Sequence, residues 1–150
     1  AAYVPFSHDY MGAPEQLDRE TVLNQLKPLL EDPKKAKLGQ NLKYDVNVLA
    51  RLGIAVAPID DTMIISFDLD AGRQLDGIGG GHGMDELADR HLGHTCLTFK
   101  EICGTGKKAF PCGGRPPDKA TDYAAEDADV TWRLYKLLKP RLAVEGGTKI

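Results

Sequence analysis

The stretch from Asp118 to Pro140 most constrains the fold, because it has the periodicity of one long helix with a carboxylate on its apolar side. At about 100° per residue, one face collects Ala120, Tyr123, Ala124, Asp127, Val130, Thr131, Leu134 and Leu138, while Glu126, Asp129, Arg133 and Lys136 are predicted to face away. A carboxylate held against a core is costly unless it is paired or binds a metal ion. The sequence therefore predicts that another segment of the chain supplies a partner for the Asp127 carboxylate.

A second helix, predicted over residues 41–53, carries the same anomaly. Its apolar face collects Leu42, Asp45, Val46, Leu49 and Leu52, and Gly53 suits the position after a helix end. Two inward-facing aspartates on separate helices are reasonable if both bind one divalent cation through oxygen. Capping of a neighbouring helix, or pairing with an arginine or lysine, is the alternative. Spacing alone does not decide between the two.

Three segments, taken in order, resemble the motifs of one family: residues 40–45 (Gln-Asn-Leu-Lys-Tyr-Asp), 61–63 (Asp-Thr-Met) and 123–131 (Tyr-Ala-Ala-Glu-Asp-Ala-Asp-Val-Thr). Residues 26–32 and 83–88 add to the resemblance, which spans nearly the whole chain. The family is the 3′-5′ proofreading exonuclease domain of bacterial DNA polymerase I, a family A DNA polymerase. The ordered set is far more specific than any single motif.

The resemblance implies an α/β protein with a ribonuclease-H-like 3′-5′ exonuclease fold, in which helices flank a mixed sheet. It also implies removal of mispaired 3′-terminal nucleotides from DNA during replication and repair, through phosphodiester hydrolysis with two divalent cations, Mg²⁺ or alternatively Mn²⁺ or Zn²⁺. By matched motif, Asp45 and Asp127 would be catalytic metal ligands, and Tyr123 would orient the attacking water. The residues implied to contact the terminal nucleotides are Gln40, Asn41 and Tyr44.

One motif of the family is missing from this chain. An Asp-x-Glu on the opening strand would lie upstream of Ala1, and the nearest imitation, residues 68–70 (Asp-Leu-Asp), is better explained as a solvated turn. We therefore expect residues 1–150 to be a proofreading domain that lacks its N-terminal strands, is weakly active or inactive alone, and is followed by a polymerase domain in the parent chain. The alternatives are a catalytically dead nucleic-acid-binding or scaffold domain of the same fold, and an unrelated α/β domain. Motif order disfavours the last.

Composition would not have suggested DNA. A chain of 150 residues with 42% hydrophobic and 27% charged residues is ordinary for one globular domain, and a net charge of -3 supplies no general positive field for nucleic acid. No apolar run approaches the roughly 20 residues that span a bilayer, and no leader pattern is evident. We expect a cytoplasmic monomer that acts on single-stranded 3′ ends of DNA and has no membrane partner.

The cysteines and glycines carry weaker signals. Cys96, Cys103 and Cys112 lack Cys-x-x-Cys spacing, so neither a disulfide framework nor a zinc knuckle is indicated. His91 and His94 lie close to Cys96 in sequence, but no fourth ligand at usual zinc spacing is evident. The glycine-rich stretch of residues 70–83 is predicted to be an exposed loop, because it offers almost no side chain to bury.

Capping signals and periodicity predict the remaining elements. They are a helix from Asp18 to Leu30 that buries Val22, Leu26, Leu29 and Leu30, strands at residues 36–40 and 54–56, a helix capped by Asp60 or Asp61 that runs through Phe67, and a helix over residues 84–92 that Gly93 closes.

Overall fold

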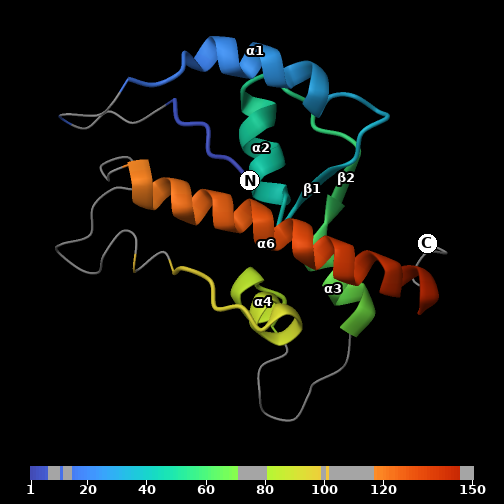
Figure 1. Cartoon of the computed structure of the whole chain (residues 1–150). Helices are drawn as coiled ribbons and strands as arrows, with labels where there is room; N and C mark the ends of the chain where they lie inside the picture. The colour runs from blue at the N-terminus through green and yellow to red at the C-terminus, as the bar shows by residue number, and fades with distance from the viewer. Residues whose placement is uncertain (7–10, 12–14, 71–80, 99–100, 102–116, 146–150) are drawn as a thin grey trace.

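The computed structural model of the chain describes residues 1–6, 11, 15–70, 81–98, 101 and 117–145. The helices and strands follow one another as α1 (Arg19–Leu30), β1 (Lys37–Gly39), α2 (Lys43–Arg51), β2 (Ile59–Asp61), α3 (Thr62–Asp70), α4 (Met84–Leu92) and α6 (Pro117–Val144). In Figure 1, α6 crosses the molecule with α1 and α2 on one side and α3 and α4 on the other. This arrangement confirms the predicted α/β class.

The core forms where α6 packs on α3 and α4. On α6, the buried apolar residues recur at every fourth position, as Val130, Leu134, Leu138 and Leu142. They form one cluster with Ile65 of α3, Leu87 and Ala88 of α4, and Cys96. Each fully buried leucine contributes on the order of 2 kcal/mol through removal of apolar surface from water. The predicted apolar face of the long helix is therefore confirmed at its centre.

The long helix does not stop at its proline. We predicted that Pro140 would end or bend α6, but the helix continues to Val144, so an end at Pro140 is wrong. Proline removes one backbone donor and leaves one carbonyl without its helical partner. Because Pro140 is exposed, solvent can satisfy that carbonyl.

The described sheet has two parallel strands, with Lys37 opposite Ile59 and Gly39 opposite Asp61. The strand predicted at residues 54–56 is wrong, since these residues are irregular and the strand begins at Ile59. Their backbone donors are used elsewhere, because the N–H of Ala55 donates to Glu31 Oε2 at 3.0 Å and the N–H of Ala57 donates to Leu30 O at 3.3 Å. The segment is thus tied to the end of α1. A mixed sheet is not seen within the described ranges.

The first helix and its cap were predicted correctly, but its buried face was not. Asp18 Oδ2 accepts from the Thr21 N–H at 2.9 Å and caps α1. Val22 is buried, whereas Leu26 and Leu29 are 38% and 45% exposed. Because α1 lies at the edge of the molecule, the described residues cover only its inner side (Figure 1).

Two further turns show how context changes a local prediction. Gly93 closes α4 with a φ of 60°, as predicted. Residues 71–80 of the glycine-rich stretch, and Cys103 and Cys112, lie outside the described residues. Gly81 and Gly83 are half-buried rather than exposed, and Gly81 O accepts from Arg90 Nη2 at 2.7 Å.

Residues 68–70 end α3 and are not a turn. Among the helices described, none is long and apolar enough to cross a membrane.

Candidate functional site

A cavity of about 560 Å³ lies where the end of β1 and the start of α2 approach α6. Its lining contains two carboxylates, one from α2 and one from α6, together with the lone tryptophan of the chain. The lining residues are Leu38, Gly39, Gln40, Leu42, Asp45, Met84, Ala124, Asp127, Ala128, Thr131 and Trp132.

Asp127 lies half-buried on the α6 side of this cavity. Burial raises the pKa of its carboxyl group, and the negative charges of Glu126 and Asp85 raise it further. Within the described part of the chain, its carboxylate pairs with no lysine or arginine. The pairing alternative that we considered from the sequence therefore finds no support at Asp127.

Asp45 lies in the first turn of α2 and reaches the same cavity from the opposite element. Burial raises the pKa of its carboxyl group, its own backbone N–H opposes the shift, and Asp61 adds to it. The residue as a whole is exposed, so Asp45 faces the cavity but is not held against a core as predicted. Leu42, just before α2, is buried, Val46 and Leu49 are half-buried, and Leu52 is 36% exposed, so the predicted apolar face is only partly covered.

Asp61 fixes the position of α2. It is 8% exposed, and it accepts backbone hydrogen bonds from Asn41 N at 2.9 Å, Leu42 N at 2.7 Å and Met63 N at 2.9 Å. One carboxylate therefore caps α3, as predicted, and also holds the turn that leads into α2. That turn contains Asn41 at a φ of 55°, which asparagine tolerates better than most residues. Asp61 thus acts as a helix cap, whereas Asp45 and Asp127 do not take up the capping role that was their alternative to binding a metal ion.

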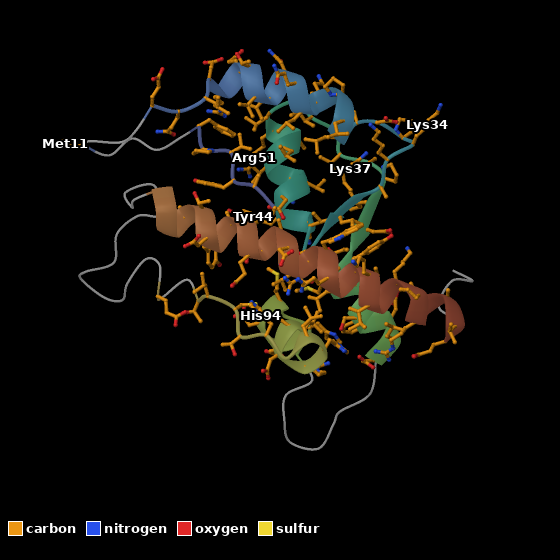
Figure 2. The ribbon with its side chains drawn as sticks, in the orientation of Figure 1. Met11, Lys34, Lys37, Tyr44, Arg51 and His94 are labelled. Atoms are coloured by element: carbon orange, nitrogen blue, oxygen red, sulfur yellow. The ribbon has the colours of Figure 1, made fainter. Side chains whose placement is uncertain are left out.

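The three residues implied to contact nucleotides are placed differently. Gln40 lines the cavity, but its amide is used within the protein: Nε2 donates to His82 O at 2.7 Å and Oε1 accepts from the Thr62 hydroxyl. Asn41 is exposed beside the cavity, and Tyr44 is 75% exposed at the start of α2 (Figure 2). Gln40 is therefore held in place by its neighbours, while Asn41 and Tyr44 are accessible.

Tyr123 lies one helical turn before Asp127, as expected, but it is not among the residues that line the cavity. It is half-buried, and Asp85 of α4 is among the charged groups that act on it. Burial raises the pKa of its phenol, and the charges of Asp127 and Asp85 add to the effect. The structure therefore places Tyr123 next to Asp127 without opening it onto the cavity.

Sequence reasoning missed two features of α6. Trp132 is 50% exposed and lines the cavity, and the small residues Ala124 and Ala128, at the two preceding positions of the same helix row, leave room beside it. This spacing of small residues before a tryptophan was a readable signal. Glu126 was predicted to face away from the packed side, which is wrong, because its carboxylate accepts from Leu97 N at 2.6 Å.

The lining of the cavity fits a divalent cation. It offers two carboxylates and, among the described residues, no lysine or arginine to neutralise them. Both carboxyl groups have a raised pKa, chiefly because burial disfavours the charged form. A bound cation would reverse this effect, since opposite charge favours the ionised form. Carboxylate oxygens are the ligands that Mg²⁺ and Mn²⁺ prefer.

Comparison with known proteins gives a consistent result. A family described as 3′-5′ exonuclease matches residues 3–143. The DNA polymerase I of Pseudomonas aeruginosa is 49% identical over 145 residues, which cover 95% of this chain and 15% of that protein. The DNA polymerase I of Rhizobium leguminosarum is 47% identical over 158 aligned positions, covering 100% of this chain and 15% of the relative. The DNA polymerase I of Treponema pallidum is 35% identical over 130 residues, 85% of this chain and 12% of that protein.

This chain therefore spans only about 15% of the length of the first two relatives. The match to the family nevertheless runs from Tyr3 to Ala143 and includes every motif residue described above. The chain belongs to the 3′-5′ exonuclease family, whose ribonuclease-H-like α/β fold it shares.

Proposed function

We propose that this chain belongs to the 3′-5′ exonuclease domain of a DNA polymerase I, that this domain removes mispaired 3′-terminal nucleotides from DNA, and that residues 1–150 alone are weakly active or inactive. The observation that carries the proposal is that Asp45 and Asp127, from two different helices, line one cavity without a described cationic partner. Both residues occupy motif positions of the family. A polymerase domain in the same polypeptide is part of the proposal, and the length of the relatives supports it.

Asp45 and Asp127 would hold the divalent cations, two ions in the complete site, with Mg²⁺ as the first choice and Mn²⁺ or Zn²⁺ as alternatives. Such ions activate a water and stabilise the leaving oxygen of a phosphodiester. Asp61, Asp85 and Glu126 add negative charge near the two aspartates. This charge would repel the phosphate of a substrate that approached without a cation, which favours bound divalent ions.

Tyr123 would orient the attacking water. A phenol is protonated at neutral pH even at its ordinary pKa of 10.0, and burial raises the pKa of Tyr123 further, so its hydroxyl can both donate and accept a hydrogen bond. Its position one turn before Asp127 on α6 supports the role, which would require the phenol to reach the edge of a cavity that it does not line.

The substrate would be a single-stranded 3′ end. Tyr44, at the start of α2, and Trp132, in the cavity lining, offer exposed aromatic surfaces, and unpaired bases stack on such surfaces without regard to sequence. The exposed Asn41 supplies an amide for the terminal nucleotide. Gln40, whose amide is bonded at both ends, would act by holding the turn that carries Asn41.

The test follows degradation of a 5′-labelled single-stranded oligonucleotide with Mg²⁺ or Mn²⁺. It uses the 150-residue chain and the longer polypeptide that we propose contains it. Asp45→Ala and Asp127→Ala are expected to lower the rate by at least about 100-fold, because each removes a charge that holds the ions. Asp129→Ala is the matched control, because Asp129 is on the same helix but pairs with Arg133 at 2.8 Å and does not line the cavity.

The outcomes separate the alternatives. Shortening from the 3′ end that depends on Asp127 supports the exonuclease. Cleavage that survives Asp127→Ala would refute the site. DNA binding without cleavage in both polypeptides would instead favour a catalytically inactive nucleic-acid-binding domain.

A further inference from the structure

A second group of metal-ligating side chains lies on the α4 side of α6. His94 and Cys96 follow the end of α4, and Glu126 comes from α6. One ligand atom from each, an imidazole nitrogen, the sulfur and a carboxylate oxygen, lie within 4.8 Å of one another. Figure 2 shows His94 between α4 and α6. The sequence did not favour a metal site of His91, His94 and Cys96, and in the fold the third member of the group is Glu126 and not His91.

The backbone around this group is already held in place. Gly93 N donates to Asp89 O at 3.1 Å and His94 N donates to Ala88 O at 3.2 Å, so the chain leaves α4 in a fixed direction. Glu126 Oε1 accepts from Leu97 N at 2.6 Å, which leaves Oε2 to face His94 Nε2 at 3.3 Å. The three side chains therefore converge through their scaffold and not only through contact with one another.

The donor set selects the kind of ion. A thiolate and an imidazole prefer zinc-like cations to Mg²⁺, and three protein ligands with one open position are a usual zinc arrangement. Cys96 is buried, but the His94 side chain is 36% exposed, so water can reach the fourth position. Burial raises the pKa of the Cys96 thiol to about 11, and the negative charges of Glu126, Asp85 and Asp127 add to the rise, so an ion that binds the sulfur has to displace its proton. A cation is the group that such surroundings stabilise.

We propose that His94, Cys96 and Glu126 bind a thiophilic divalent cation, Zn²⁺ in the first instance, at a site separate from the Asp45 and Asp127 carboxylates. Binding forms a metal–sulfur bond and releases the thiol proton to solvent. The bound ion would clamp residues 93–98 against α6. Glu126 and Asp127 are adjacent in sequence, so the clamp would also steady the segment of α6 that carries Asp127.

The simpler explanation is that Glu126 only anchors residues 93–98 through its two hydrogen bonds. A titration of the chain with Co²⁺ distinguishes the two, because a cobalt–thiolate bond gives a charge-transfer absorption that carboxylate ligands do not give. We expect one equivalent of Co²⁺ to produce this absorption and Zn²⁺ to bleach it. The measurement does not depend on nuclease activity. The metal-site proposal can therefore fail while the proposed function stands, and the proposed function can fail while the metal-site proposal stands.

Variants identify the ligands. Cys96→Ser should abolish the absorption, and His94→Ala and Glu126→Gln should each weaken Co²⁺ binding by at least about 10-fold, since even outer partners of metal ligands contribute that much. Thr95→Ala, an exposed position between two ligands, should leave it unchanged. Asp127→Asn should also keep the absorption, which separates this site from the cavity.

Two results would overturn the proposal. One is the absence of the absorption at saturating Co²⁺. The other is its persistence in Cys96→Ser together with its loss when Cys103 and Cys112 are both replaced by serine, because other thiols would then be the ligands. Circular dichroism of each variant checks that it folds. If Cys96→Ser does not fold, the surface variant His94→Ala decides, and undiminished Co²⁺ binding in it refutes the site.

Discussion

Replacing Asp61 by alanine should destabilise the chain more than its single position suggests. The carboxylate is buried and accepts three backbone hydrogen bonds, from Asn41, Leu42 and Met63, at 2.7 to 2.9 Å. Asp61→Ala leaves all three N–H groups without their acceptor. The bond to Leu42 is buried, whereas those to Asn41 and Met63 are only partly so, and water can replace the acceptor there.

The magnitude follows from these environments. A buried donor left without a partner costs about 2 kcal/mol, and each of the two partly buried donors costs about 0.5 kcal/mol when water replaces the carboxylate. The expected loss is therefore about 3 kcal/mol of unfolding free energy. With a urea dependence of about 2 kcal/mol per molar, typical of a small domain, the unfolding midpoint should fall by about 1.5 M.

Urea unfolding followed by circular dichroism measures this loss. Asp61→Asn keeps one acceptor oxygen and should lose less than Asp61→Ala. Asp18→Ala is the matched control, because Asp18 caps α1 from an exposed position and its loss should be clearly smaller. A loss below about 1 kcal/mol for Asp61→Ala, or one no larger than that of Asp18→Ala, would refute the view that this carboxylate holds the turn before α2.

Three further predictions concern α6. Leu134→Ala should cost about 3 kcal/mol of unfolding free energy, because it leaves a cavity at a fully buried position, whereas Leu137→Ala should cost less than about 1 kcal/mol; equal urea midpoints would contradict the core assignment. Single-stranded oligonucleotide should quench the fluorescence of Trp132, the only tryptophan, and Trp132→Leu should weaken binding by about 10-fold; unchanged emission at saturating DNA would exclude stacking there. Burial raises the folded-state pKa of Asp127, so ionisation of its carboxyl group lowers stability as pH rises above 3.8. In EDTA at pH 7, Asp127→Asn should therefore melt at a higher temperature than the unchanged chain, and this advantage should be lost below pH 3.8. Equal melting temperatures at pH 7 would contradict the raised pKa.

Much of the secondary structure could be predicted because its causes are local. Asp18 and Gly93 act through hydrogen bonds and backbone angles within a few residues. Asp18 marks the start of α1 and Gly93 marks the end of α4, both where the sequence indicates. The periodicity of α6 likewise determined that Val130 and Leu134 would share a buried face with Asp127 nearby. Where the local signal was weak, as at residues 54–56, the prediction failed, because bonds to the end of α1 decided the backbone.

The site depended on tertiary structure. The sequence by itself determined that Asp45 and Asp127 interrupt apolar helical faces, and its motifs placed both in an exonuclease family. Only the fold decided that they would line one cavity, that Asp61 would hold the turn before α2 as well as cap α3, and that Glu126 would turn toward His94. The physical reason is that a carboxylate is stabilised by whichever donors or cations lie near it, and these come from segments far away in the chain.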